Sequence, residues 1–252
     1  MLLLECNDLS FSYHTHTGEI SVIKSVSFRI HKGEFVSIVG PSGCGKSTLL
    51  GLLTGILSPE EGSIKIHYKQ KGTQSFYGYM LQQDHLLEWY DIWDNICLGP
   101  KINHCLDSAC KDYLHTLLTR YQLDSFAHKK PSQLSGGMRQ RAALIRTLAM
   151  KPELLYLDEP FSALDYQNRL NAADDIGKII QKEGKTAVLV THDIGEAISL
   201  SSRVLVLSKR PATIVKEFVL PFQNTGLSSL EIRNLPEFST YFNLIWKELN
   251  TT

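Results

Sequence analysis

Apolar positions near the start of this chain recur at every second residue, which is the period of a β-strand. Leu2, Leu4 and Cys6 therefore share one face of an extended segment, and residues 22–30 alternate in a similar way. Residues 35–39 form a short, almost continuously apolar run, as expected of a strand that is buried on both faces. The first part of the chain is therefore predicted to be β-structure.

Helical spacing replaces this alternation further along the chain. Residues 47–56 are predicted to form a helix that ends before a Ser-Pro pair. Residues 62–80 are predicted to form two short strands around a polar turn at residues 69–74. The stretch 83–150 is predicted to be helical, and its last helix covers residues 135–150. An earlier helix in that stretch is indicated by apolar positions at Leu106, Ala109, Tyr113, Leu114, Leu117 and Leu118.

From residue 154 onward, short apolar strands alternate with amphipathic helices. The predicted strands are residues 154–157, 186–190 and 204–207, and the predicted helices are residues 165–182 and 194–200. Continuously apolar strands interleaved with helices indicate a mostly parallel sheet that is covered on both faces. The predicted fold class is therefore α/β.

The end of the chain forms a separate predicted element. Ser228 and Glu231 have the spacing of a capping box, and Pro236 is expected to interrupt the helix that they begin. An apolar stripe with helical spacing follows at Phe238, Tyr241, Phe242, Ile245 and Leu249. A helix that packs on the body of the protein is favoured over a site for a partner.

The 252 residues suffice for one large domain and a short tail. The domain is predicted to cover residues 1–222. Its core comprises residues 1–82 and 150–222, and its helical insert comprises residues 83–149. Residues 223–252 form the predicted helical tail.

Composition excludes several classes of protein. Hydrophobic residues make up 43% of the chain, which is too many for a disordered protein. The 26 Lys and Arg residues balance 26 Asp and Glu residues, and this neutrality weighs against a nucleic-acid partner. The apolar runs are far shorter than the ~20 residues of a spanning helix, and the start lacks the basic region of a secretory signal. Five cysteines without a C-x-x-C pair favour a reducing cytosol over a disulfide framework or a zinc site.

Residues 40–47 match the pattern G-x-x-x-x-G-K-[ST] between a predicted strand and a predicted helix. Glycines in such a loop let backbone N–H groups surround phosphate oxygens, and the helix N-terminus adds its positive dipole end. Lys46 is expected to reach the β- and γ-phosphates of ATP, and the Ser47 hydroxyl is expected to bind Mg²⁺. The residues expected to contact ATP in this loop are Gly40, Pro41, Ser42, Gly43, Cys44, Gly45, Lys46, Ser47 and Thr48.

Two acidic residues, Asp158 and Glu159, directly follow the apolar run at residues 154–157. A parallel strand would deliver them to the carboxyl edge of the sheet, where open α/β folds bind ligands. Asp158 is expected to take part in the Mg²⁺ shell. Glu159 is expected to polarise the water that attacks the γ-phosphate.

Residues 134–141, Leu-Ser-Gly-Gly-Met-Arg-Gln-Arg, resemble the signature motif of ATP-binding cassette ATPases and lie, as in that family, between the phosphate loop and the acidic strand. Further matches to the family are the Q-loop glutamine at Gln82, the D-loop at residues 162–165, the switch histidine segment at residues 191–193 and an adenine-stacking aromatic at Tyr13. The resemblance covers residues 2 to about 210. It implies a P-loop NTPase core of the RecA type, an N-terminal antiparallel β subdomain and an inserted helical subdomain.

The resemblance also implies roles for individual residues. Two chains would form a head-to-tail homodimer in which each ATP lies between the phosphate loop of one chain and the signature of the other. The implied groups are Ser135, Gly136, Gly137 and Asp165 from the opposite chain, Lys46, Glu159 and His192 for catalysis, and Ser47, Gln82 and Asp158 for Mg²⁺. His192 would contact the γ-phosphate or Glu159 and sense the loss of the phosphate, and Gln82 would couple the metal to the helical insert.

Details of the motifs resemble one branch of the family. Met138 stands where the wider family most often has Gln, and this form of the signature resembles importers of nitrate, sulfonates, taurine and related small solutes. Residues 86–89 and 94–96 resemble the same branch, although Glu88 occupies a position where proline is frequent.

An apolar and aromatic cluster follows Gln82. In the family, this surface meets a coupling helix of a membrane subunit, and docking is favoured over the alternative of packing between insert and core. The residues expected to dock are Leu86, Leu87, Trp89 and Trp93. Arg139 and Arg141 are expected to stabilise the signature helix rather than to bind nucleic acid.

The favoured function is therefore the ATP-hydrolysing subunit of an importer, a translocase bound peripherally to the cytoplasmic face of the membrane. Its implied partners are a second copy, integral membrane permease subunits and, indirectly, an extracytoplasmic solute-binding protein. A soluble cassette ATPase of DNA repair or translation is disfavoured, because the chain has one cassette and no sustained heptads. A non-catalytic nucleotide-binding regulator is disfavoured by the intact Lys46, Asp158, Glu159 and His192.

Overall fold

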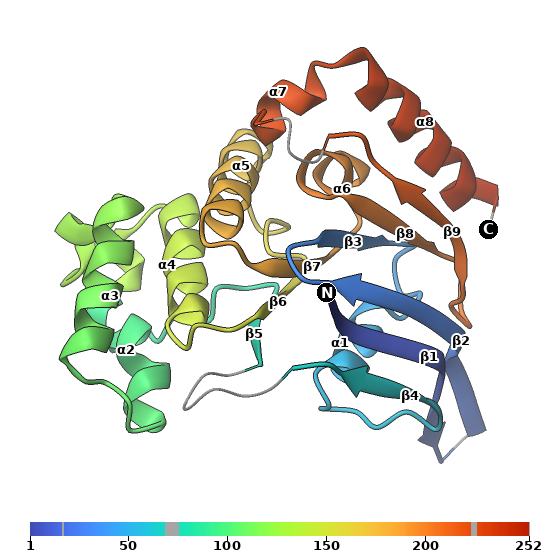
Figure 1. Ribbon diagram of the computed structural model, residues 1–252, viewed down its shortest axis with the longest axis horizontal. Helices are drawn as coiled ribbons and strands as arrows, with labels where there is room; N and C mark the ends of the chain where they lie inside the picture. Colours follow the sequence, from blue (N-terminus) through green and yellow to red (C-terminus); the bar gives the residue numbers. More distant parts are fainter. Residues whose placement is uncertain (17, 69–75, 223–225, 252) are drawn as a thin grey trace. The chain divides into compact units, whose positions relative to one another are not determined.

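The computed structural model describes residues 1–16, 18–68, 76–222 and 226–251 and divides the chain into two compact units (Figure 1). Unit 1 comprises Met1–Tyr68 and Thr186–Thr252, and unit 2 comprises Lys69–Lys185. The polar turn expected at residues 69–74 and the expected start of the tail at residues 223–225 lie outside the described residues.

Unit 1 begins with an antiparallel sheet of the order β2-β1-β4. Its strands are β1 (Leu2–Thr15), β2 (Gly18–His31) and β4 (Glu61–Ile66). The strict alternation expected at the start of β1 is wrong in detail, because Leu3 and Leu4 are both buried. A register shift between Leu2 and Leu4 lets two successive side chains point into the core.

The second group of strands in unit 1 carries the predicted parallel pairing. Strand β3 (Phe35–Val39) lies between β7 (Thr186–Thr191) and β8 (Arg203–Leu207), and both pairs are parallel. Every residue of β7 is buried, which explains the unbroken apolar run at residues 187–190 between its two terminal threonines. Strand β9 (Ile214–Val219) runs antiparallel to β8 and was not expected, because Lys216 and Glu217 interrupt its apolar residues and Phe218 is its one buried side chain.

Two helices of unit 1 follow strands of this sheet. Helix α1 (Lys46–Leu53) is shorter than expected because Gly55, at φ 73°, turns the chain out of the helix before the Ser-Pro pair is reached. Helix α6 (Ile194–Leu200) begins at Asp193, whose side chain accepts a hydrogen bond from the backbone N–H of Glu196 at 3.0 Å.

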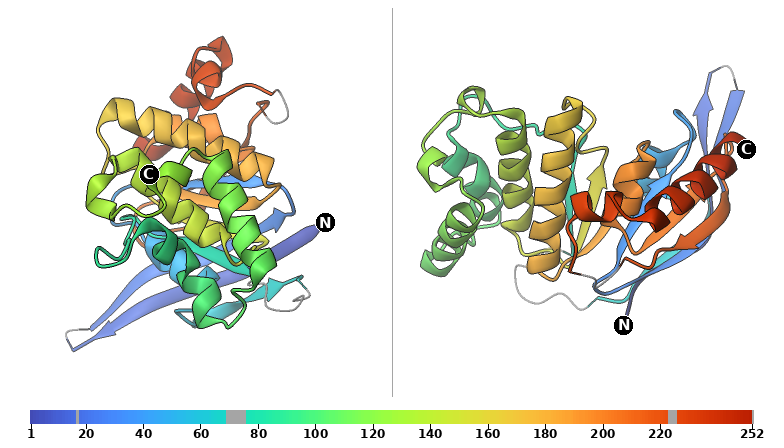
Figure 2. Two further views of the ribbon diagram at one scale, coloured as in Figure 1. Left: turned by 90° about the vertical axis from the view of Figure 1, so that its left-hand side faces the viewer. Right: turned by 90° about the horizontal axis from the view of Figure 1, so that it is seen from above.

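The tail of unit 1 consists of two helices, α7 (Ser229–Arg233) and α8 (Pro236–Thr251). The expected capping box is present: Ser228 Oγ accepts from the Glu231 N–H at 3.2 Å, and Glu231 Oε2 accepts from the Ser228 N–H at 2.7 Å. The expected break falls between Arg233 and Pro236. Helix α8 then runs uninterrupted to Thr251 (Figure 2, right).

The apolar stripe of α8 packs on the core of unit 1. Ile245 is fully buried in a cluster with side chains of β3, α6, β8 and β9, and four neighbours in the stripe are partly buried against it. Those neighbours are Phe238, Tyr241, Phe242 and Leu249. Packing on the protein body, the favoured expectation for this stripe, is confirmed.

Within its described residues, 76–185, unit 2 contains two strands and four α-helices. Strands β5 (Tyr77–Met80) and β6 (Leu154–Asp158) pair in parallel. The helices are α2 (Ile92–Ile102), α3 (Ser108–Arg120), α4 (Gly136–Leu148) and α5 (Tyr166–Lys182). Helix α4 contacts α2, α3 and α5, so it is the central helix of this unit (Figure 1).

The helix starts in unit 2 follow from their caps. Asp91, Asp107, Ser135 and Asp165 each accept a hydrogen bond from the backbone N–H three residues later. Two of these helices therefore begin one residue later than the sequence pattern indicates, because Ser135 and Asp165 are the N-caps. Across the described ranges, no helix is both long and apolar enough to span a bilayer.

We expect Ile245→Ala to lower the free energy of unfolding by about 2–5 kcal/mol, because it leaves a cavity in the cluster beneath α8. Leu244→Ala, on the exposed side of the same helix, is the matched control and should change the free energy by less than about 0.5 kcal/mol. Urea unfolding monitored by fluorescence measures both. Equal effects of the two substitutions would mean that the tail does not contribute to the core.

Candidate functional site

The glycine-rich loop of unit 1 lies between the end of β3 at Val39 and the start of α1 at Lys46. Gly43 and Gly45 have φ values of 73° and 120°, which residues other than glycine rarely adopt. A Cβ atom at Gly45 would also lie 2.6 Å from Val22 Cγ1. The loop conformation therefore requires glycine at this position for two independent reasons.

Lys46 is only 6% exposed, and its ammonium lies against the loop itself. Its Nζ donates hydrogen bonds to the carbonyl oxygens of Gly40 at 2.9 Å and Pro41 at 3.1 Å. A buried charge needs such partners, and these two fix a positive charge at the start of a helix. This arrangement suits an anionic ligand such as a phosphate chain.

Two further residues, Cys44 and Arg210, belong to or contact this loop. Cys44 is buried, and this burial raises the pKa of its thiol despite the nearby charge of Lys46, so the sulfur fills space rather than reacting. Arg210 donates from Nη2 to the carbonyl oxygen of Gly43 at 2.6 Å. Arg210 was not among the residues predicted from the sequence. Its position just after β8 could have indicated its place beside the loop, because β8 pairs in parallel with β3 and ends at the same edge of the sheet.

Two further predicted residues of unit 1 lie at this edge or beside the loop. The Tyr13 and Thr48 hydroxyl oxygens are 3.4 Å apart, and the Tyr13 ring is partly exposed and packs edge-on against Phe11. His192 follows β7, whose last residue Thr191 pairs with the last residue of β3. Unit 1 therefore brings Tyr13 beside Thr48, and it places His192 at the edge from which the loop departs.

Unit 2 places Gln82 and Asp158 at one edge of its own strand pair, because Met80 and Leu157 are paired residues. The Asp158 carboxylate is buried and accepts a hydrogen bond from Tyr79 Oη at 3.0 Å. Burial and the charge of Asp158 both raise the pKa of Tyr79, which keeps the phenol protonated as a donor. A buried carboxylate that a hydrogen bond from Tyr79 orients is a suitable ligand for a cation.

Glu159 adopts a left-handed backbone conformation, with φ at 43°, which is uncommon for a residue other than glycine. The turn is held by Ser162, whose hydroxyl donates to the Glu159 carbonyl oxygen at 2.9 Å. Gln82 Nε2 in turn donates to Ser162 Oγ at 3.2 Å. The predicted Q-loop glutamine, D-loop serine and acidic residue therefore form one hydrogen-bonded chain within unit 2.

The signature residues occupy the N-terminus of α4. Ser135 is exposed and caps the helix, accepting from the Met138 N–H at 3.4 Å. A Cβ atom at Gly136 would lie 2.6 Å from Leu164 Cδ2, whereas Gly137 faces open space. Asp165, also exposed, caps α5, and hydrogen bonds from Asn168 lower the pKa of its carboxyl. Unit 2 thus places the signature beside the D-loop.

The residues expected to dock on a membrane subunit differ in exposure. Leu86 is only 5% exposed, and Trp93 stacks on His115 with ring centroids 4.1 Å apart, so both contribute to packing within unit 2. Leu87 is half-buried. Trp89 is 69% exposed and is the member of the set that a partner can reach.

Comparison with known proteins agrees with these features. The sequence profile of the family described as "ABC transporter" matches residues 23–162. The chain is 42% identical to the uncharacterised ABC transporter ATP-binding protein YtlC of Bacillus subtilis, over all of this chain and 97% of that protein. It is 36% identical to the taurine import ATP-binding protein TauB of Ruegeria pomeroyi, over 94% and 89% of the two chains. It is 38% identical to the nitrate transport protein NasD of Klebsiella oxytoca, over 86% and 84%.

A solved structure is similar as well. The dimeric, post-hydrolysis state of the ATP-binding cassette MJ0796 bound to ADP and Pi aligns with a TM-score of 0.71 and 30% identity. The alignment covers 86% of this chain and 99% of that one.

We expect Gly45→Ala to abolish binding of a fluorescent ATP analogue, because the added methyl group meets both Val22 and an unfavourable φ. Gly55→Ala is the matched control, since Gly55 also has a positive φ but open space around its Cα. The control should lower the unfolding midpoint by a few degrees and keep binding. Wild-type affinity in Gly45→Ala would contradict the close packing described for the loop.

Proposed function

The chain belongs to the ABC transporter family of ATP-binding proteins and is an ATPase, and from this premise we propose that it powers the import of a small solute through separate membrane subunits. The observation that carries the proposal is the ammonium of Lys46, which is buried in the glycine loop against two carbonyl oxygens. ATP hydrolysis in this chain would supply the free energy that moves the solute.

The solute is proposed to resemble nitrate, a sulfonate or taurine. Two relatives, named for taurine import and for nitrate transport, support this class. The Met138 form of the signature is consistent with the same branch. Because the cassette itself is not expected to touch the solute, an extracytoplasmic solute-binding protein and the membrane subunits would select it.

Within the chain, each catalytic residue is assigned a role that fits its surroundings. Lys46 would bind the β- and γ-phosphates, Glu159 would accept a proton from the attacking water, and His192 would contact the γ-phosphate. Tyr13 would stack on the adenine through its exposed face.

Magnesium is proposed as the accompanying ion, with three oxygen donors from this chain. The Ser47 hydroxyl, the Gln82 amide oxygen and the Asp158 carboxylate are ligands of the hard kind that Mg²⁺ prefers, and Asp158 is already desolvated. The ion would neutralise charge on the phosphates. These residues would hold it, and Tyr79 would orient Asp158 through its hydrogen bond.

Dimerisation around two ATP molecules is the proposed working state. Ser135 and Asp165 are exposed, and they lie at helix N-termini with Gly136 and Gly137. A second chain could therefore offer its nucleotide to this surface. The dimeric arrangement of the similar MJ0796 cassette supports this proposal.

Membrane association is proposed to be peripheral, on the cytoplasmic face. Trp89 and its neighbour Tyr90 are exposed aromatic residues of the kind enriched at protein interfaces. We therefore propose that Trp89 contacts a permease subunit, together with the half-buried Leu87.

We expect Lys46→Ala to reduce the rate of ATP hydrolysis by at least about 10²–10³-fold, because the γ-phosphate loses its buried cation. Phosphate release by the purified protein measures this rate. Lys24→Ala, an exposed lysine on β2, is the control and should retain full turnover. Undiminished turnover in Lys46→Ala would refute the assignment of the loop.

We expect Glu159→Gln to form a stable dimer in the presence of ATP and Mg²⁺, because nucleotide binds but is not hydrolysed. Sedimentation velocity measures the dimer fraction. Adding Lys46→Ala to this variant should return it to a monomer. A Glu159→Gln protein that stays monomeric at saturating ATP would argue against the proposed dimer.

A further inference from the structure

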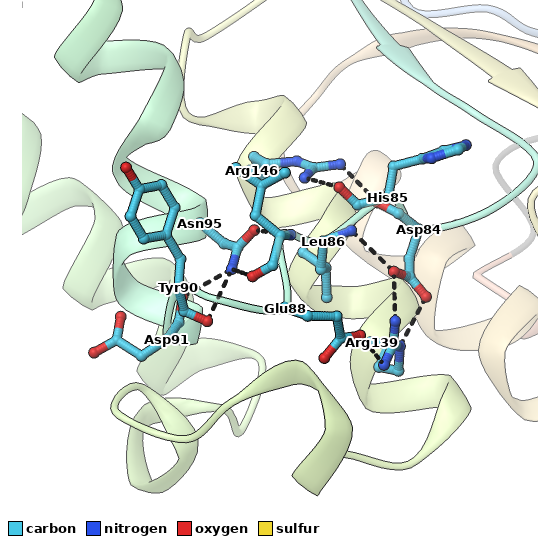
Figure 3. Close-up of polar contacts among 10 residues, drawn as sticks. Asp84, His85, Leu86, Glu88, Tyr90, Asp91, Asn95, Arg139 and Arg146 are labelled. Atoms are coloured by element: carbon cyan, nitrogen blue, oxygen red, sulfur yellow. Dashed lines mark hydrogen bonds and ion pairs between the residues drawn. The ribbon is translucent and has the colours of Figure 1, made fainter.

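Arg139, in the first turn of α4, makes three charge-assisted hydrogen bonds to the segment that follows β5 (Figure 3). Its Nε and Nη2 donate to the two carboxylate oxygens of Asp84, at 2.8 and 3.0 Å. Its Nη1 donates to Glu88 Oε1 at 2.9 Å. A planar guanidinium that engages one carboxylate with two bonds and a second carboxylate with one has little freedom to move.

Arg146 lies two turns further along the same face of α4, and its guanidinium binds backbone carbonyl oxygens of the same segment (Figure 3). It donates to the carbonyl oxygens of Asp84 at 2.6 Å and His85 at 2.7 Å. His85 has a φ of 45°, an uncommon conformation for a residue with a side chain. The two bonds from Arg146 therefore hold this segment in a shape that it would not adopt alone.

The other end of the segment is fixed by Asn95, a fully buried residue of α2. Its Oδ1 accepts from the Leu87 N–H at 2.7 Å, and its Nδ2 donates to the carbonyl oxygens of Leu87 at 3.1 Å and Asp91 at 2.9 Å. Lys130 adds a bond from Nζ to the Trp89 carbonyl oxygen at 2.6 Å. We call residues 84–91 the clamped loop.

The clamped loop and the signature are thus tied to the same short stretch of chain. Arg139 N–H donates to the carbonyl oxygen of Ser135 at 2.9 Å, so the side chain of Arg139 projects from the turn that Ser135 caps. Lys130, which binds the Trp89 carbonyl oxygen, precedes this turn in the sequence. A displacement of the clamped loop must either carry the first turn of α4 with it or break charge-assisted hydrogen bonds.

We propose that Arg139 is a positioning residue that couples the clamped loop to the first turn of α4, which carries the signature. When a partner that binds Trp89 displaces the clamped loop, this coupling moves Ser135, Gly136 and Gly137 relative to the nucleotide of a second chain. Asp84, whose side chain is 16% exposed, is the permanent anchor of this coupling. Glu88 precedes Trp89 in the sequence, and its side chain is 52% exposed. The Arg139–Glu88 ion pair is therefore the contact that a partner bound at Trp89 can break. The inference rests on the proposed function, since it assigns regulation to the same dimer.

The experiment uses the full chain with Glu159→Gln and compares Arg139→Met, Arg139→Lys, Asp84→Asn and Glu88→Gln. The matched control is Arg120→Met, which removes another arginine–glutamate ion pair of unit 2 that does not touch the clamped loop. Three quantities are measured: affinity for a fluorescent ATP analogue at concentrations where the chain is monomeric, the ATP-dependent dimerisation constant, and hydrogen exchange of residues 84–91 and 131–140 without ATP.

We expect Arg139→Met to weaken ATP-dependent dimerisation about 10-fold or more while nucleotide affinity of the monomer stays unchanged. Exchange should rise in both segments. Asp84→Asn should reproduce these changes from the loop side, Glu88→Gln should cause a smaller change, and Arg139→Lys should recover part of the loss. The double variant Asp84→Asn with Arg139→Met should be no worse than Arg139→Met alone, because Arg139→Met already removes the Asp84–Arg139 pair that Asp84→Asn weakens.

Two results would overturn the coupling. The first is unchanged exchange of residues 131–140 in Asp84→Asn and Arg139→Met, which would confine Arg139 to anchoring the loop. The second is equal loss of dimerisation in Arg120→Met, Arg139→Met and Arg139→Lys, which would indicate general destabilisation. If the parent Glu159→Gln protein stays monomeric with ATP, the proposed dimer fails, and the exchange measurement, made without ATP, still decides the coupling.

Discussion

The parallel pairing of β3 with β7 and β8 is the constraint on which the chemistry of unit 1 depends. Parallel strands end at a common edge, so residues that are far apart in sequence become neighbours without any direct signal between them. The glycine loop, His192 and Arg210 all leave that edge. Unit 2 repeats the principle on a smaller scale, because the β5–β6 pair brings Gln82 to Asp158.

Sequence analysis identified the residues whose chemistry depends on local order. The phosphate loop, the signature and the acidic strand end are contiguous stretches that combine a motif with a strand or helix boundary, and the structure places each at that boundary. The family, the fold class and the ATPase activity expected from them are confirmed by the comparisons. The roles of single residues stay predictions, since they depend on a bound nucleotide.

The features that escaped prediction depend on tertiary contacts. Strand β9 is established by its pairing with β8, since Lys216 and Glu217 interrupt its short apolar run and only Phe218 is buried. Leu86 and Trp93 look like surface residues in an aromatic-rich stretch, yet Leu86 is buried and the Trp93 ring stacks on His115 of α3. Arg139 was expected to stabilise its own helix. Its carboxylate partners lie in a loop that precedes it by roughly fifty positions, and no periodicity links the two.

The buried ammonium of Lys46 has a consequence for the division of free energy between folding and binding. Its water shell is already removed in the folded chain, where two carbonyl oxygens replace it only in part. The desolvation cost of this cation therefore falls on the stability of the protein, and a phosphate that reaches it meets a charge that is stripped and oriented in advance. Tight nucleotide binding at this loop is therefore obtained at the expense of folding stability.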